Sequence, residues 1–259
     1  MVTSIAEFMD SDMMSDALDL SAFHGFSGLH GGLSAAMLLR EMRQHAPSGS
    51  RLARMTANFL RPADGPLLLS SELVKAGSKA SIVKGSAISG AELAIEATSI
   101  FVLASRTGAA PLTPSMPDTI VGRSDAQLFE IPAEFVPISQ RMEIRPATDT
   151  LPYSGSDTPE LCAWIRLKDS LANNDERVLL LADALAPSFS AVLSELRMVP
   201  TVAMSATMSE QVPAVDFDWV LVRARTTMAG RDGWVREVID VWTEDGVHLI
   251  TSDQLRVVR

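Results

Sequence analysis

The chain has 259 residues, of which 47% are hydrophobic and 21% are charged, a composition typical of a folded globular protein. Acidic residues outnumber basic ones by 32 to 22, which gives a formal net charge of −10. Sequence-independent binding of nucleic acid needs a basic surface, so the charge disfavours a nucleic-acid partner. No apolar run approaches the roughly 18–20 residues of a membrane-spanning helix, and we expect no membrane span.

Cysteine and histidine usage limits the chemistry further. Cys162 is the only cysteine, so no intrachain disulfide can form, and we expect a reducing, cytoplasmic compartment. No Lys or Arg precedes Arg40, so the chain shows no basic start of a secretory signal. No two histidines have the i, i+4 spacing of a helical zinc site, and we predict no metal. The four histidines are His24, His30, His45 and His248.

The first predicted helix covers residues 33–44. Its first two turns are apolar nearly all round, which is typical of a helix enclosed by other structure. His30, Gly31 and Gly32 precede it, and the two glycines allow another group to approach the backbone closely. The free N–H groups at the start of the helix could then polarise a carbonyl oxygen. A tight turn into the helix would explain the same three residues.

Three segments with period-two alternation follow, and a similar set closes the chain. Residues 67–77, 78–89 and 90–103 alternate apolar and polar side chains, as do residues 219–230, 231–245 and 246–258. This period predicts half-buried antiparallel strands. The turns between them fall at matching places, so the two sets form a weak internal repeat.

A second helix is predicted over residues 178–196, ahead of the second set of strands. Residues 116–135, which contain two prolines, read as a linker between an N-terminal unit, residues 1–115, and a C-terminal unit, residues 136–259. Residues 137–145 and 161–168 look like strands that open the second unit. The sequence therefore predicts an α+β protein with two antiparallel sheets, each wrapped around one long helix.

Asp183 is the sharpest candidate for chemistry. It is the only polar residue in the apolar segment 178–186. Burying an unpaired carboxylate is costly, so we expect Asp183 to have partners. Pro187, four residues on, has no N–H for the Asp183 carbonyl, and we expect the helix to kink there. Asp183 could instead cap or bond a neighbouring backbone group, or start the helix.

Thr201 and Gln254 are the other polar candidates. Thr201 lies at the start of a predicted strand, residues 199–208, and Gln254 lies in the last strand. A hydroxyl and a carboxamide can together hold a water by donating and accepting hydrogen bonds. Taken singly, each is equally explained as an ordinary strand residue.

The order of motifs along residues 20–259 resembles the double-hotdog acyl-CoA thioesterases, the thioesterase II or TesB-like group. The motifs are His30-Gly31-Gly32, Phe59-Leu60-Arg61-Pro62, Ala76-Gly77-Ser78, Ala182-Asp183-Ala184, Thr201 with Ser205, and Ser252-Asp253-Gln254. The resemblance implies two hotdog units in tandem. It also implies an acyl-CoA substrate and hydrolysis to free acid and CoA, without a metal or an organic cofactor.

The same resemblance implies roles for individual residues. Asp183, Thr201 and Gln254 match the residues that bind and activate the attacking water. The backbone around His30, Gly31 and Gly32 would bind the substrate carbonyl.

We expect one site per chain, because the first helix has no acid at the positions where one would sit. Those positions are Ala36, Met37 and Leu39.

Three other functions stay open. Hydratases and dehydratases of acyl thioesters share the hotdog fold, but they would want an Asp-His pair in one segment, and no His lies near Asp183 in the sequence. The chain could also bind acyl-CoA or lipid without turnover, or serve as a structural or partner-binding protein. Antiparallel sheets with open edges tend to self-associate, so we expect a homodimer.

Overall fold

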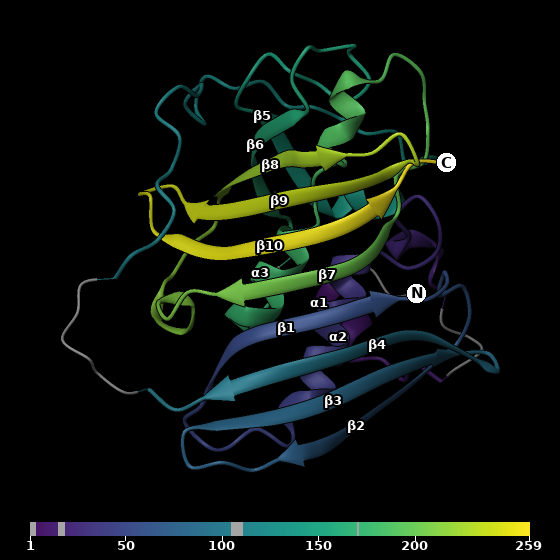
Figure 1. Cartoon of the computed structure of the whole chain (residues 1–259), viewed down its shortest axis with the longest axis vertical. Helices are drawn as coiled ribbons and strands as arrows, with labels where there is room; N and C mark the ends of the chain where they lie inside the picture. Colours follow the sequence, from purple (N-terminus) through teal and green to yellow (C-terminus); the bar gives the residue numbers. More distant parts are fainter. Residues whose placement is uncertain (1–3, 15–18, 105–110, 170) are drawn as a thin grey trace.

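The computed structural model describes residues 4–14, 19–104, 111–169 and 171–259. Its strands form one antiparallel sheet of ten strands in the order β2-β3-β4-β1-β7-β10-β9-β8-β6-β5 (Figure 1). The strands are β1 (Arg51–Phe59), β2 (Leu67–Lys75), β3 (Ala80–Ser89), β4 (Glu92–Val102), β5 (Met142–Pro146), β6 (Glu160–Leu167), β7 (Thr201–Met208), β8 (Val220–Ala229), β9 (Trp234–Thr243) and β10 (His248–Val257).

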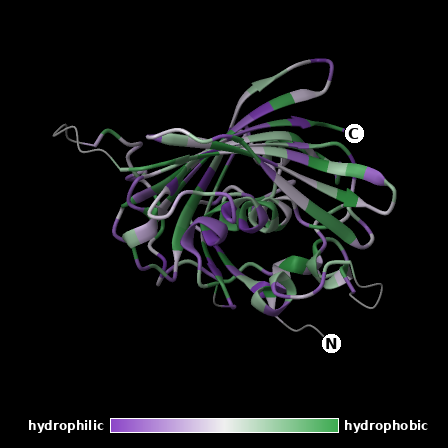
Figure 2. Ribbon diagram, turned by 90° about the horizontal axis from the view of Figure 1, so that it is seen from below, coloured by the Kyte–Doolittle hydropathy of each residue, from purple (hydrophilic) through white to green (hydrophobic). Residues whose placement is uncertain are grey.

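The helices lie on the concave side of this sheet, which arches over them in Figure 2. The α-helices are α1 (Ile5–Met9), α2 (Gly31–Arg43) and α3 (Asn174–Leu181). The short 3₁₀ turns are η1 (Ser21–Phe23), η2 (Pro137–Arg141), η3 (Ser188–Val192) and η4 (Val212–Ala214). Within the described ranges, no helix is long and apolar enough to cross a bilayer.

The two halves of the chain share one sheet, so the expectation of two separate sheets is wrong. All six strands of the internal repeat are confirmed, and the order β2-β3-β4-β1 is mirrored by β8-β9-β10-β7. The halves meet where β1 pairs directly with β7, with Thr56 opposite Ser205. Without this pairing, β1 and β7 would each be an edge strand with unpaired backbone N–H and C=O groups. Pairing with each other supplies hydrogen-bond partners for these groups. β6 and β5 extend the sheet beyond β8.

The second helix is much shorter than the predicted 178–196. α3 begins four residues earlier, because the Asn173 side chain caps it by accepting hydrogen bonds from the N–H groups of Asp175 and Glu176. It ends at Leu181. Pro187 cannot donate to the ladder and restricts the residue before it, so the chain does not resume the α-helix and forms η3 instead. The expected kink is therefore replaced by a helix end at Leu181 and a separate 3₁₀ turn after Pro187.

The proline-rich connecting segment packs on the convex face of the sheet. Trp242 Nε1 donates to the Pro114 carbonyl at 2.9 Å, and Trp164 Nε1 donates to the Val121 carbonyl at 2.9 Å. Residues 105–110 of this stretch lie outside the described residues. The strand predicted at 137–145 is shorter than expected, because residues 137–141 form η2 and β5 begins at Met142.

Helices α2 and α3 run antiparallel to each other beneath the sheet. Arg40 and Arg43, in the last turn of α2, pair with Glu176 and Asp175 in the first turn of α3. At the other end, Gly32 at the start of α2 approaches the end of α3. The start of the first helix therefore lies beside Asp183, two residues beyond α3.

Candidate active site

Two glycines allow the start of α2 to approach Asp183. A Cβ atom built on Gly31 would lie 2.8 Å from Asp183 Oδ2. One built on Gly32 would lie 2.9 Å from Asp183 Cβ and 3.0 Å from the Leu179 carbonyl oxygen. Such separations are closer than side-chain carbons normally tolerate. The pair therefore has a packing role in addition to starting a helix.

The carbonyl group of Asp183 is bound by His30. His30 Nε2 lies 2.9 Å from this oxygen, and His30 Nδ1 accepts the Leu33 N–H at 3.3 Å. Because Nδ1 accepts, the ring proton of a neutral imidazole sits on Nε2 and is donated to the carbonyl. Pro187 has no N–H to offer that carbonyl. His30, from the other half of the chain, supplies the missing donor.

The Asp183 carboxylate is mostly buried, with a side chain 11% exposed, and it is surrounded by donors. Oδ2 accepts the Gly32 N–H at 2.8 Å, at the start of α2. Oδ1 accepts Gln254 Nε2 at 3.2 Å, and Arg256 Nη2 lies 3.5 Å from the same oxygen. A helix N-terminus and a guanidinium both favour negative charge, so the surroundings suit an ionised carboxylate.

Gln254 links Asp183 to Thr201. Its side chain is fully buried on β10, and its amide must point Nε2 at the carboxylate, because an ionised carboxylate only accepts hydrogen bonds. Its Oε1 therefore faces Thr201, whose hydroxyl donates to it at 3.0 Å. The hydroxyl hydrogen is thus committed, and the oxygen lone pairs of Thr201 remain able to accept.

Arg256 and Glu237 join this group, and the sequence analysis missed both. Arg256 is 5% exposed and Glu237 is 1% exposed, although both are charged. Arg256 lies two residues after Gln254 on the same face of β10, and Glu237 lies directly opposite Gln254 on β9. Both lie at positions of alternating strands whose side chains face inward, and this pattern could have revealed them in the sequence.

The six residues singled out as site residues come together, with one changed role. The Gly32 N–H, expected to be free for a substrate oxygen, donates to Asp183 instead. Both ring nitrogens of His30 are also engaged by protein groups. Among the described hydrogen bonds, the Gly31 N–H has no acceptor, so it is the donor at this helix start that could meet a substrate.

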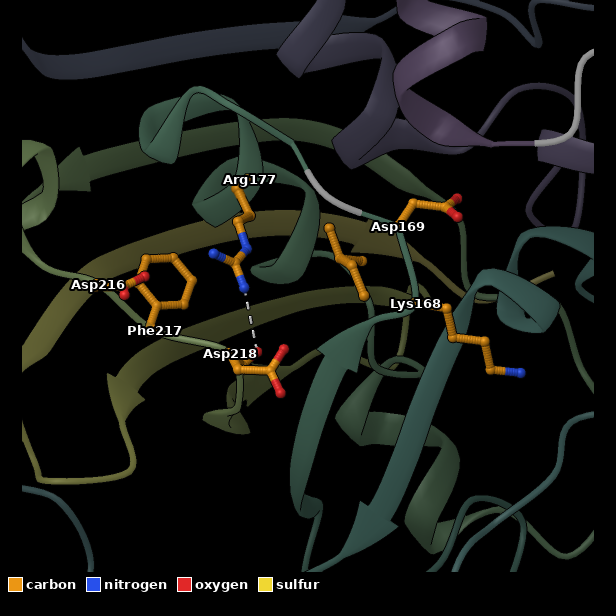
Figure 3. Close-up of a pocket in the computed structure, with 7 residues that line it drawn as sticks. Lys168, Asp169, Arg177, Asp216, Phe217 and Asp218 are labelled. Atoms are coloured by element: carbon orange, nitrogen blue, oxygen red, sulfur yellow. Dashed lines mark hydrogen bonds between the residues drawn. The ribbon is translucent and has the colours of Figure 1, made fainter.

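Two surface pockets lie near the C-terminal half of the sheet, and Asp183 lines neither of them. A pocket of about 470 Å³ is lined by residues from β6, α3 and the segment before β8, and none of the site residues lines it (Figure 3). There Arg177 stacks over the Phe217 ring at 4.2 Å, and burial lowers the pKa of Arg177 against the opposing charges of Asp218 and Asp216. A smaller, apolar pocket of about 30 Å³ includes Leu185 and Ala186, just beyond Asp183.

A metal site is absent from the part of the chain that the structure describes, in the sense that no three His, Cys, Asp or Glu residues gather as ligands. The donors around Asp183 are amide and guanidinium N–H groups, which cannot ligate a cation. The arrangement instead holds a carboxylate in one orientation by hydrogen bonds to both of its oxygens.

Two sequence patterns of one family cover most of the chain. Residues 21–102 match the acyl-CoA thioesterase N-terminal domain, and residues 115–258 match the acyl-CoA thioesterase C-terminal domain. The chain therefore belongs to the acyl-CoA thioesterase family. No curated protein sequence matches it.

Solved structures show the same fold at low sequence identity. A conserved protein of unknown function with hotdog fold from Alicyclobacillus acidocaldarius has a TM-score of 0.85 at 20% identity, over 100% of this chain and 99% of that one. A tesB protein of Mycobacterium avium subspecies paratuberculosis has a TM-score of 0.70 at 18% identity, over 89% and 87%. The acyl-CoA thioesterase II TesB2 of Mycobacterium marinum has a TM-score of 0.67 at 16% identity, over 93% and 90%. Dehydratase domains also share the fold.

Proposed function

We propose that this protein hydrolyses acyl-CoA thioesters to a free acid and CoA, with Asp183 as the general base. The observation that carries the proposal is the mostly buried Asp183 carboxylate, held by Gly32 from one half and Gln254 from the other. Membership of the acyl-CoA thioesterase family supplies the substrate class.

The attacking water would lie between Asp183 and Thr201. The Thr201 hydroxyl donates its hydrogen to Gln254, so its oxygen can accept a hydrogen bond from that water. Asp183 accepts the other water hydrogen. These two acceptors orient the oxygen lone pair of the water toward the thioester carbonyl carbon.

The reaction then needs one proton transfer in each direction. As the water oxygen bonds to the carbonyl carbon, its proton passes to Asp183, and the carbonyl oxygen becomes an oxyanion near the Gly31 N–H. The C–S bond then breaks, the sulfur leaves with the bonding pair, and Asp183 returns the proton to it. Thiolate is a good leaving group, so general base assistance of roughly 10²- to 10⁴-fold suffices.

A second candidate function is hydration or dehydration of an acyl thioester. The structure corrects the argument against it, because His30 Nε2 lies 3.9 Å from Asp183 Oδ2 although the two residues are far apart in the sequence. Such chemistry needs a His-Asp pair that exchanges protons with the substrate. His30, however, uses one nitrogen to cap α2 and the other to bind the Asp183 carbonyl. Hydrolysis, which needs only the carboxylate, fits this arrangement better.

One set of assays on the purified protein separates the candidates. Saturated acyl-CoA thioesters of increasing chain length are assayed for CoA thiol release, and 3-hydroxyacyl- and enoyl-CoA are assayed for interconversion at the conjugated double bond. Hydrolysis predicts saturable thiol release without interconversion. Interconversion without thiol release would identify a hydratase or dehydratase. Saturable binding with neither reaction would identify an acyl-CoA-binding protein.

A further inference from the structure

Arg256 and Glu237 form a buried ion pair for which the proposed hydrolysis has no role. Their side chains are 6% and 1% exposed, on adjacent strands and facing the helices. Removing two charges from water costs several kcal/mol per ion, and apolar residues of similar volume often stabilise a fold as well or better. Stability is therefore a weak reason for an ion pair at this position, and the neighbours of the pair indicate a different one.

The pair holds the segment that carries Asp183 at two points. Arg256 Nε donates to Glu237 Oε2 at 2.5 Å, while Arg256 Nη2 lies 3.5 Å from Asp183 Oδ1. The other carboxylate oxygen of Glu237 accepts the N–H of Ser188, five residues after Asp183 at the start of η3. Glu237 thus binds both the guanidinium and the backbone that follows Asp183.

Arg256 lies closer to Glu237 than to Asp183, which suits a base whose carboxylate must remain able to accept a proton. A guanidinium is planar and rigid, so anchoring Nε on Glu237 fixes the direction of Nη2 toward Asp183. Glu237 takes the close, charge-assisted contact, and Asp183 receives the longer one. Arg256, Glu237 and Asp183 together carry one net negative charge. The close ion pair therefore forms with Glu237 and leaves the charge of Asp183 without a close counter-ion.

We propose that Arg256 is a positioning residue that orients the Asp183 carboxylate, and that Glu237 positions Arg256. The proposal rests on the hydrolysis proposed above. Neither residue need touch the substrate, so their loss should lower kcat and leave KM nearly unchanged.

The test replaces the whole pair, so that no charge is left buried alone. The double variant Arg256→Met/Glu237→Met should remain folded, with kcat for acyl-CoA lowered of the order of 10- to 100-fold and KM changed by less than about threefold. A matched control is Arg223→Met/Glu160→Met. Arg223 also bonds a Glu on the next strand, at 2.7 and 2.8 Å, but on the convex face. This control should keep the wild-type kcat.

A conservative variant decides the matter if the double variant does not fold. Arg256→Lys keeps the charge, but a single ammonium cannot bond Glu237 and reach Asp183 in the same fixed geometry. We expect a lower kcat at unchanged KM, with an unchanged midpoint of thermal unfolding. Wild-type kcat in a folded Arg256→Met/Glu237→Met variant or in Arg256→Lys would overturn the positioning role. If Asp183→Asn also kept full activity, the proposed function itself would fail instead.

Discussion

Hydrogen bonds hold both the backbone carbonyl and the side-chain carboxylate of Asp183. His30 binds the backbone carbonyl, and Gly32 and Gln254 bind the side-chain oxygens. These partners come from the start of α2 and from β10, so rotation of the carboxylate would break bonds on two sides. The general base that we propose is thus aligned before the substrate arrives.

Gly32→Ala tests the close approach of α2 to this acid. The added methyl group would meet the Asp183 Cβ at 2.9 Å and the Leu179 carbonyl at 3.0 Å, and neither belongs to a flexible chain end. We expect the free energy of unfolding to fall by about 1–3 kcal/mol, although alanine favours helix. Urea unfolding measures this change in the free energy of unfolding. Gly65→Ala, whose Cβ would lie 3.8 Å from the nearest atom, is the control. Equal stability of both variants would contradict the packing role.

The two ends of the α2–α3 pair differ in what they contact. The start of α2 meets Asp183, whereas the end of α2 meets the first turn of α3 through Arg40 and Arg43. Ser99 on β4 stands at the position of the internal repeat that Gln254 occupies on β10. It is fully buried, and its hydroxyl contacts Met42 Sδ at 3.6 Å. Ion pairs and a methionine thus fill the end of the helix pair that corresponds to the candidate site.

Arg43→Met tests the ion pairs at that end. Asp175 is 5% exposed, and without Arg43 its charge would be buried without a counter-ion. We expect a loss of about 2–4 kcal/mol in the free energy of unfolding, because removing one partner costs more than removing both. The double variant Arg43→Met/Asp175→Asn should recover at least half of that loss. A double variant as unstable as the single one would show that the side chains act only by packing.

Acid stability should depend on a buried carboxylate on the convex face of the sheet. Burial alone would raise the pKa of Asp240, but hydrogen bonds from His248 and Thr251, with the charge of Arg225, outweigh burial and lower it. A carboxyl whose pKa is lowered by folding adds stability above its ordinary pKa of about 4, and this contribution is lost as the pH falls through the lowered value. We expect the stability difference between wild type and Asp240→Asn to shrink between pH 6 and pH 3. Urea unfolding at several pH values measures it, and a constant difference would refute the assignment.

The sequence predicted the strands well and the second helix poorly, for identifiable reasons. Period-two alternation is a local signal, and it located all six repeated strands. The start of α3 is fixed by the Asn173 cap, and Pro187 prevents the helix from resuming, although the apolar run between them looks continuous in the sequence. The contact of His30 with Asp183 joins residues of different halves, and pairing of this kind leaves no trace in the local sequence.

At the scale of the whole molecule, the β1–β7 pairing makes the two halves one structural unit. Residues from both halves surround Asp183, so their relative placement must be fixed to within a fraction of an ångström for the site to work. The sheet continues through the seam without interruption (Figure 1). The seam therefore positions the candidate site as well as closing the fold.

Hydrogen exchange tests whether the two halves unfold as one unit. The amides of β1 and β7 lie at the centre of the sheet, whereas β2 lies at an edge and is largely exposed. We expect the seam strands to exchange with the slowest class, at the rate of global unfolding, and β2 to exchange earlier. Early exchange at the seam, with each half protected separately, would show two independent units.

The most direct measurement of the central claim is CoA thiol release by Asp183→Asn beside Asp253→Asn. Asp253 adjoins Gln254 but points outward, where Arg236 binds it. Burial, with the nearby charge of Glu160, raises the pKa of the Cys162 thiol to about 12, so a thiol reagent near pH 8 detects released CoA and not the folded protein. We predict that Asp183→Asn lowers kcat by roughly 10²- to 10⁴-fold while Asp253→Asn retains wild-type turnover. Full turnover by Asp183→Asn would contradict the account.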